Sequence, residues 1–231
     1  MEQTLKITNV LSDPTRYYIY QYVTKRQSEV TVQEIADNFE IHPNVARLHL
    51  SKLEDVHMLI SETKKTGKGG RPSRLYRLSE EIIQLHFPFR DYQLLSKIAI
   101  ETMISLGPVG KDALYLTGKK YGQELIYSQI PNNNKNILDL SFENKIEILK
   151  DAATLAGFYP EITFNPEQTK VYMHVKNCPF KELAKVHTDA VCDMHYAFLQ
   201  GMFEVLFEGV ELEQPENMMN GCENCRYQAF V

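Results

Sequence analysis

Three short helices, two of them joined by a tight turn, are predicted in the first third of the chain and constrain its fold more than any other feature. The first follows Asp13-Pro14, where aspartate can cap a helix and proline suits its first position. The second opens with Thr-Val-Gln-Glu at residues 31–34, which is a capping box. A turn over residues 40–42 leads to the third, which begins at Pro43. Two short helices joined in this way form the helix-turn-helix pattern.

A basic β-hairpin is predicted directly after the third helix. Residues 59–63 read as a strand, and residues 75–78, which alternate apolar and polar side chains, read as its returning partner. The segment between them, residues 64–74, is rich in lysine, arginine and glycine and predicts a cationic tip. A helix-turn-helix followed by such a hairpin is a winged helix.

The polar side chains of the third helix and the cations of the hairpin predict an interface with double-stranded DNA. A helix can enter the major groove, where arginine pairs with guanine and asparagine with adenine. The apolar stripe predicted to face the core contains Val45, Leu50, Leu53 and Val56. The residues off that stripe, predicted to read bases, are Asn44, Arg47, Ser51 and Lys52. The hairpin residues predicted to meet phosphates or the minor groove are Lys64, Lys65, Lys68, Arg71 and Arg74.

Two alternatives to DNA contact stay open in this part of the chain. A lysine-rich and glycine-rich turn is also what a solvated hairpin tip looks like. Arg16, near the start of the first helix, suits a salt bridge as well as a phosphate contact.

The charge of the chain is divided unevenly between its two ends. Residues 1–78 hold 12 Lys and Arg against 9 Asp and Glu, whereas the remainder of the chain holds 13 against 21. A basic first part on an acidic remainder suits a reader of polyanions joined to a different module. The polar residues 1–9 do not form a secretory signal, and no apolar run reaches the ~18–20 residues of a membrane helix, so a cytoplasmic location is expected.

The rest of the chain predicts an α+β fold behind the winged helix. Long helices are expected over residues 92–106 and 108–126, and their apolar faces exceed what a lone helix hides, which predicts pairing in a homodimer. A further helix over residues 142–156 is expected to end at Gly157. The elements expected after it are a hairpin of residues 161–164 and 171–175, a helix starting near Cys178, a long helix over 189–207, a strand over 211–214 and a terminal strand. The predicted domains are a winged helix at 1–80, linking helices at 81–130 and an α+β sensor at 131–231.

All four cysteines lie in the last 54 residues, at positions 178, 192, 222 and 225. Thiols stay reduced in the cytosol, so this clustering favours a metal or redox site over structural disulfides. Four thiolates match zinc and a four-iron cluster equally well by ligand type. Only Cys222 and Cys225 form a short pair, and isolated cysteines are more typical of an iron–sulphur cluster held by several elements. A metal-free switch with a Cys222–Cys225 disulfide, and four idle buried thiols, are the alternatives.

Other catalytic and ligand signals are weak in this chain. His174, His187 and His195 lie near the cysteines and are predicted to be surface or hydrogen-bonded side chains rather than ligands. The sequence holds no nucleotide-binding glycine loop and no H-E-x-x-H motif. We therefore predict a regulator and not an enzyme, with an enzyme or small-molecule module carrying an incidental winged helix as the competing interpretation.

The first third of the chain resembles the winged helix of bacterial repressors of the ArsR and DeoR type. The resemblance is carried by "LSDPTRYYIYQYV", "VQEIADNFEIHPNVARLHLSKLEDVHML" and "GKGGRPSRLYRLS". It implies a transcription regulator that acts as a repressor. The Cys-Val-Cys metal signature that ArsR-type proteins carry on the recognition helix is absent here, so metal sensing through that helix is not implied.

The segment from Asn177 to Phe230 resembles the sensor of iron–sulphur-cluster repressors (SufR-like), which pair a winged helix with an "NCP…C…G…C-x-Y" tail. The resemblance implies cluster ligation by Cys178, Cys192 and Cys225. It also implies a homodimer in which the state of the cluster controls affinity for DNA. Cys222 departs from this pattern, which makes it a candidate fourth ligand or shifts the site towards zinc.

Overall fold

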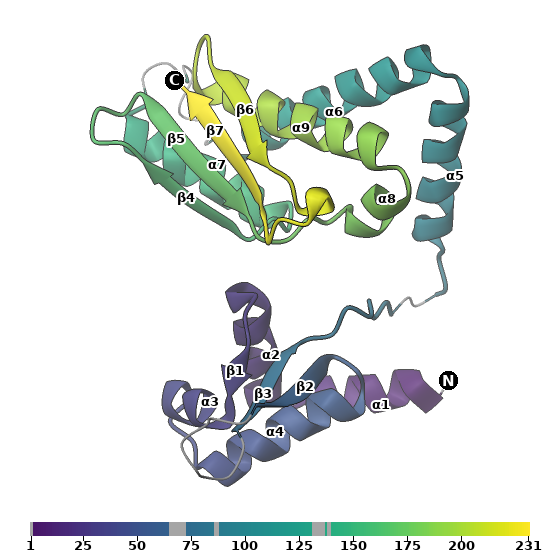
Figure 1. Cartoon of the computed structure of the whole chain (residues 1–231), viewed down its shortest axis with the longest axis vertical. Coiled ribbons are helices and arrows are strands. Elements are labelled where there is room, and N and C mark those ends of the chain that lie inside the picture. Colours follow the sequence, from purple (N-terminus) through teal and green to yellow (C-terminus); the bar gives the residue numbers. More distant parts are fainter. Residues whose placement is uncertain (1, 65–72, 86–87, 131–136, 138–139) are drawn as a thin grey trace. The chain divides into compact units, whose positions relative to one another are not determined.

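The structure is a computed structural model that describes residues 2–64, 73–85, 88–130, 137 and 140–231. The chain divides into two compact units, Met1–Arg90 and Asp91–Val231 (Figure 1). Helices and antiparallel sheets occur in both units, which confirms the predicted α+β class. No helix among the described residues is both long enough and apolar enough to cross a bilayer.

The first unit is built from four helices and a small sheet. Its elements are α1 (Glu2–Leu11), α2 (Pro14–Arg26), β1 (Val30–Thr31), α3 (Val32–Asn38), α4 (Pro43–Asp55), β2 (Leu59–Lys64) and β3 (Ser73–Leu78). The strands pair antiparallel in the order β1-β3-β2. The predicted caps are confirmed, because Asp13 accepts from the backbone N–H of Arg16 and Thr31 accepts from that of Glu34.

Helix α1 is not among the helices that the sequence predicts, because most of its residues are polar. Ile7 and Val10 lie one turn apart on it, and both are buried in the core of the first unit. That core also contains the fully buried Ile35, Leu53 and Tyr76. The prediction that Val45 belongs to the core stripe is wrong, because Val45 is 41% exposed on the outer side of α4.

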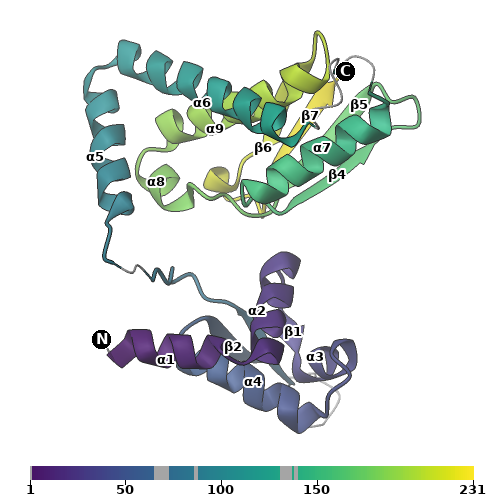
Figure 2. The same cartoon turned by 180° about the vertical axis from the view of Figure 1, so that it is seen from behind.

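The second unit is a four-stranded antiparallel sheet with helices packed on it. Its elements are α5 (Tyr92–Ser105), α6 (Pro108–Gln129), α7 (Phe142–Leu155), β4 (Pro160–Phe164), β5 (Lys170–Val175), α8 (Lys181–Val186), α9 (Thr188–Leu206), β6 (Glu211–Glu216), η2 (Met218–Asn220) and β7 (Cys225–Phe230). The strand order is β4-β5-β7-β6. Figure 2 shows α7 and α9 on one side of this sheet, with α6 lying along α9. The linking helices predicted over 92–106 and 108–126 therefore pack within this second unit as α5 and α6.

The register of the sheet decides which side chains face the helices. Burial alternates along β5 and β7, so that Met173 and Tyr227, which are direct partners across the two strands, both lie in the core. At the end of the same ladder Val175 pairs with Cys225, which points the Cys225 side chain into the helix-covered face. This register places one of the four thiols against α9.

Helices α6 and α9 approach closely because glycines line the contact. A Cβ added to Gly122 would lie 1.9 Å from the carbonyl oxygen of Phe198, and one added to Gly201 would lie 2.1 Å from that of Lys119. Only a residue without a side chain fits at either place. The close approach holds α9, which carries Cys192 and His195, firmly against the body of the unit.

Candidate functional site

The outer face of α4 carries the residues predicted to read DNA. Asn44, Arg47 and Ser51 follow one another at helical spacing, so they share that face. The Arg47 guanidinium donates to the side-chain oxygen of Asn44 at 3.1 Å, which aligns two exposed groups that can each pair with a base edge. Lys52, at the edge of this face, lies 3.7 Å from Asp55.

Leu48 lies between these polar residues and was missed by the sequence analysis. It is 55% exposed, although an apolar residue in the middle of α4 would be expected in the core. Its spacing of four from Asn44 and of three from Ser51 was the available signal, because residues three or four apart share a face of a helix. An exposed apolar side chain on this face can contact the methyl group of thymine.

The orientation of α4 is held by contacts at its inner face. His49 is buried and its Nδ1 lies 3.9 Å from the carboxylate of Asp13, the residue that caps α2. Burial lowers the pKa of His49, and the backbone N–H of Arg16 lowers the pKa of Asp13. Arg16 also contacts Asp13 at 3.5 Å and donates to the carbonyl oxygen of Val10 at 2.9 Å. Arg16 therefore forms the salt bridge that was one of its two predicted roles.

The hairpin cations have different surroundings. Arg74 is bound to Glu54 and to Ser61, so its charge is already paired. Lys64, the last residue of β2, is exposed. Lys65, Lys68 and Arg71 lie outside the described residues.

The structure brings three of the four cysteines together in the second unit. Cys178 lies three residues before α8, Cys192 is on α9 and Cys225 opens β7. Each of these three thiols interacts electrostatically with the other two. Cys222, in the segment before β7, interacts with Cys225. Thiols separated by up to 47 positions in the sequence thus lie in the same region of the second unit.

Asn217 lies between two of these thiols. Its side-chain oxygen is 3.8 Å from the sulfur of Cys225, and its side chain also hydrogen-bonds to Cys192. The backbone N–H of Met218 donates to the Cys225 sulfur at 3.4 Å. Residues 217–218 therefore tie β7 to α9 through sulfur.

The thiols are protonated at neutral pH in this arrangement. Burial raises the pKa of Cys178 to about 11, and it also raises the pKa values of Cys192 and Cys225. Since the thiolate is the metal ligand and the nucleophile, any metal bound here must displace these protons.

His195 completes the cluster and was predicted to be an ordinary surface or hydrogen-bonded side chain. It is 3% exposed, and its Nδ1 lies 3.9 Å from the sulfur of Cys178. Phe158 and Phe180 pack against its ring with centroids 5.0 and 5.5 Å away. Burial lowers the pKa of His195 to about 4, so the ring is neutral. Its Nε2 is buried and has no hydrogen-bond partner among the described residues.

Comparison with known proteins identifies the first unit. The family described as "Helix-turn-helix domain" matches residues 11–62. Residues 11–62 form a helix-turn-helix domain. This domain supports a DNA-binding transcription regulator as the general role of the chain. No curated protein matches the chain.

Two solved structures are similar to larger parts of the chain. One is the phenol-responsive sensory domain of the transcription activator PoxR with phenol, at 16% identity and a TM-score of 0.44, covering 80% of this chain and 89% of that one. The other is a trafficking protein particle complex subunit 3 from Naegleria fowleri covalently bound to palmitic acid, at 16% identity and a TM-score of 0.41. It covers 60% of this chain and 95% of that one.

The thiol cluster outside the helix-turn-helix domain suits soft metals by its chemistry but not a single ion by its spacing. Thiolates and imidazole are ligands for zinc and for iron–sulphur centres. Within the described parts of the chain, no three His, Cys, Asp or Glu side chains are placed to hold one metal ion. Tetrahedral zinc with bonds of ~2.3 Å needs sulfurs roughly 3.8 Å apart. A centre with several metal atoms accepts a wider arrangement of ligands.

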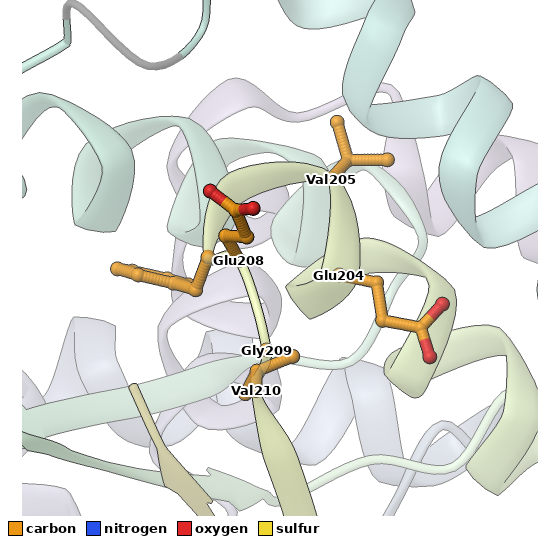
Figure 3. A pocket seen from close by; sticks show the side chains of 6 residues that line it. Glu204, Val205, Glu208, Gly209 and Val210 are labelled. Atoms are coloured by element: carbon orange, nitrogen blue, oxygen red, sulfur yellow. The ribbon is translucent and has the colours of Figure 1, made fainter.

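A hollow lies beside the end of α9 in the second unit. Its lining includes Glu204, Glu208 and Val210, and Figure 3 shows the two carboxylates pointing in different directions. Glu204 is paired with Lys119 at 2.8 Å. The hollow is open and its acidic groups do not converge. It is therefore a weaker candidate for a ligand site than the thiol cluster.

Proposed function

We propose that this chain is a homodimeric transcription repressor whose affinity for DNA is controlled by an iron–sulphur cluster at Cys178, Cys192 and Cys225. The observation that carries the proposal is that these three thiols come from separate elements and lie near enough to interact electrostatically, in a chain whose other unit contains a helix-turn-helix domain. Free thiols scattered for packing have no reason to meet. The assignment of repressor comes from the resemblance to ArsR-type and SufR-like proteins.

DNA recognition is assigned to the outer face of α4 and to the hairpin. Asn44, Arg47 and Leu48 present an amide, a guanidinium and an apolar surface to the major groove. Ser51 and Lys52 extend this face, and Lys64 meets the phosphate backbone. Arg47→Ala should weaken binding to the cognate site by ~1–3 kcal/mol, because it removes a guanidinium that can pair with guanine through two hydrogen bonds. Unchanged affinity would exclude Arg47 from base readout.

Dimerisation is assigned to α5. None of its 14 residues is buried, although it is an apolar helix. Leu94, Leu95 and Ile98 are each more than half exposed. Such a face is unfavourable in water, and pairing with the same face of a second copy would remove it from solvent. Two copies would also supply the two recognition helices that half-sites about one helical turn (~34 Å) apart require.

A multinuclear cluster is favoured over a single zinc ion by the spacing of the ligands. The described thiols interact pairwise but are not gathered around one point. Ligands of a cluster come from several elements, as Cys178, Cys192 and Cys225 do. Binding of the cluster would join α9, β7 and the segment before α8. It can shift the equilibrium between the two conformations of the regulator only by the difference in their affinity for the cluster.

Purification without air, followed by iron, sulfide and zinc analysis, tests this assignment. We expect a brown protein with iron and acid-labile sulfide in equal amounts, and an affinity for DNA that changes when the cluster is removed. A colourless protein with one zinc per chain would replace the cluster with a structural zinc site. A metal-free protein whose DNA affinity changes on oxidation would establish the thiol switch instead, which the proximity of Cys222 to Cys225 permits.

A further inference from the structure

Val45 is an apolar residue on the exposed side of α4, in the first turn of that helix. The sequence predicts it to belong to the core, yet 41% of it is accessible to solvent. The core side of α4 is formed instead by Ala46, Leu50 and Leu53, each of which is fully buried. Because alanine favours a helix more than valine does, neither the core nor helix formation explains a valine at this position.

Val45 and Leu48 form an apolar pair on the surface of α4. Leu48 follows Val45 by three residues, so the two side chains are neighbours with Cβ atoms about 5–6 Å apart. Both are exposed, and contact with an apolar group would remove both from water. A single methyl group placed between them can touch both, because carbon atoms in contact lie about 3.5–4.0 Å apart.

The side chains around this pair indicate which partner would cover it. Helix α4 lies within the segment that matches the helix-turn-helix family. Asn44 precedes Val45 and Arg47 precedes Leu48, and both of these polar residues are exposed. Their amide and guanidinium groups suit the edges of bases in the major groove. The apolar group that bases present in that groove is the C5 methyl of thymine.

We propose that Val45 and Leu48 form the two walls of one notch on α4, which holds the methyl group of a single thymine. The inference rests on the proposed binding of DNA and deepens it, because it assigns Val45 to the reading face as a further specificity-determining residue. Val45 contacts the methyl group from the first turn of α4, and Leu48 contacts it from the next turn. Removal of either wall leaves the methyl group partly in water.

The affinity of the full-length protein for duplexes that differ by one methyl group tests this proposal. The duplex is selected by the protein from a random library, and each thymine is replaced in turn by deoxyuracil. We expect one replacement to weaken binding by the parent protein about fourfold, the value of one buried methyl group. In Val45→Ala this preference for thymine should fall below twofold, at the same position as in Leu48→Ala. The double variant should show no preference there.

Two further variants separate a thymine contact from a general effect on α4. Val45→Thr keeps the shape of valine but replaces one methyl group with a hydroxyl, and it should also lower the preference for thymine. Leu5→Ala removes an exposed apolar side chain from α1 and should keep the full preference. Thermal unfolding of each variant shows that the fold is retained.

The possible results separate this inference from the proposed function. If Val45→Ala keeps the full preference, or changes it at a different thymine from Leu48→Ala, the two residues do not share one methyl group. If no deoxyuracil replacement affects the parent protein, the notch holds no thymine, although the binding of DNA stands. A parent protein that selects no duplex from the library would overturn the proposed function together with this inference.

Discussion

Arg74 binds Glu54 through one guanidinium nitrogen, Nη2, which lies 2.9 and 2.7 Å from the two carboxylate oxygens. The pair joins β3 to the last turn of α4, with Ser61 of β2 as a third partner. The guanidinium is half exposed, so the pair adds little to stability. The pair does, however, neutralise the charge of Arg74, which the sequence of the hairpin predicts to contact DNA.

The salt dependence of DNA binding should distinguish Arg74 from Lys64. Each phosphate contact contributes about 0.9 to the slope of log K against log salt concentration. Lys64→Ala should lower that slope by about one unit, whereas Arg74→Ala should change it by less than about half a unit. Glu54→Gln should raise it, because Arg74 is then free to meet a phosphate. Equal losses in Lys64→Ala and Arg74→Ala would show that Arg74 leaves Glu54 when DNA binds.

Leu48 should read a thymine methyl group. A duplex selected by the full-length protein from a random library supplies the site, and each thymine in it is replaced in turn by deoxyuracil, which lacks only that methyl. At one position we expect a loss of about 1 kcal/mol, near the value of one buried methyl group. Leu48→Ala should lose the discrimination at that position alone. If no replacement affects binding by the parent protein, Leu48 makes no such contact.

The glycine contact between α6 and α9 should be intolerant of any side chain. Gly122→Ala would bring a methyl group within 1.9 Å of a backbone oxygen, so one helix must move. We expect the free energy of unfolding to fall by about 3 kcal/mol or more. Gly157→Ala is the matched control, because its Cβ meets open space and it only strains a backbone with φ of +82°. That variant should lose about 1 kcal/mol in chemical denaturation.

Acid should destabilise the reduced, metal-free protein through His195. The pKa of this residue is lowered from 6.5 to about 4 by burial, so the folded state binds fewer protons than the unfolded state between these pH values. Its contribution is fully present above pH 6.5 and is lost as the pH falls to 4, amounting to about 3 kcal/mol at most. Urea titrations at pH 7, 5.5 and 4.5 measure this change. His195→Phe should flatten the profile, and His174→Gln should not.

Charge on α5 should prevent dimer formation. Ile98→Glu places a carboxylate in the middle of the exposed apolar face, and Lys97→Ala changes the adjacent polar position as its control. In sedimentation equilibrium the parent protein and Lys97→Ala should show twice the 26.7 kDa mass of one chain, and Ile98→Glu the mass of one. A parent protein that is already monomeric would remove α5 as the interface.

Local pattern in the sequence was sufficient for most of the elements. The caps at Asp13 and Thr31, the helix over 142–156 with its end at Gly157, and the hairpin around residues 165–167 are all present. Each depends on neighbours a few residues apart, which is the range over which periodicity and capping act. Helix α1 was missed because only two of its side chains, Ile7 and Val10, reach the core.

The sequence by itself therefore determined the helix-turn-helix pattern and the α+β class, and it marked the four cysteines as candidate ligands. Only the tertiary structure decided that Cys178, Cys192 and Cys225 lie near one another, that His195 is buried against Cys178, and that Arg74 is paired. The physical reason is that these contacts join residues far apart in the sequence, whereas local patterns report only on near neighbours. Which sulfurs converge depends on the pairing of Val175 with Cys225 and on the glycine contact that positions α9, and both join residues that lie far apart along the chain.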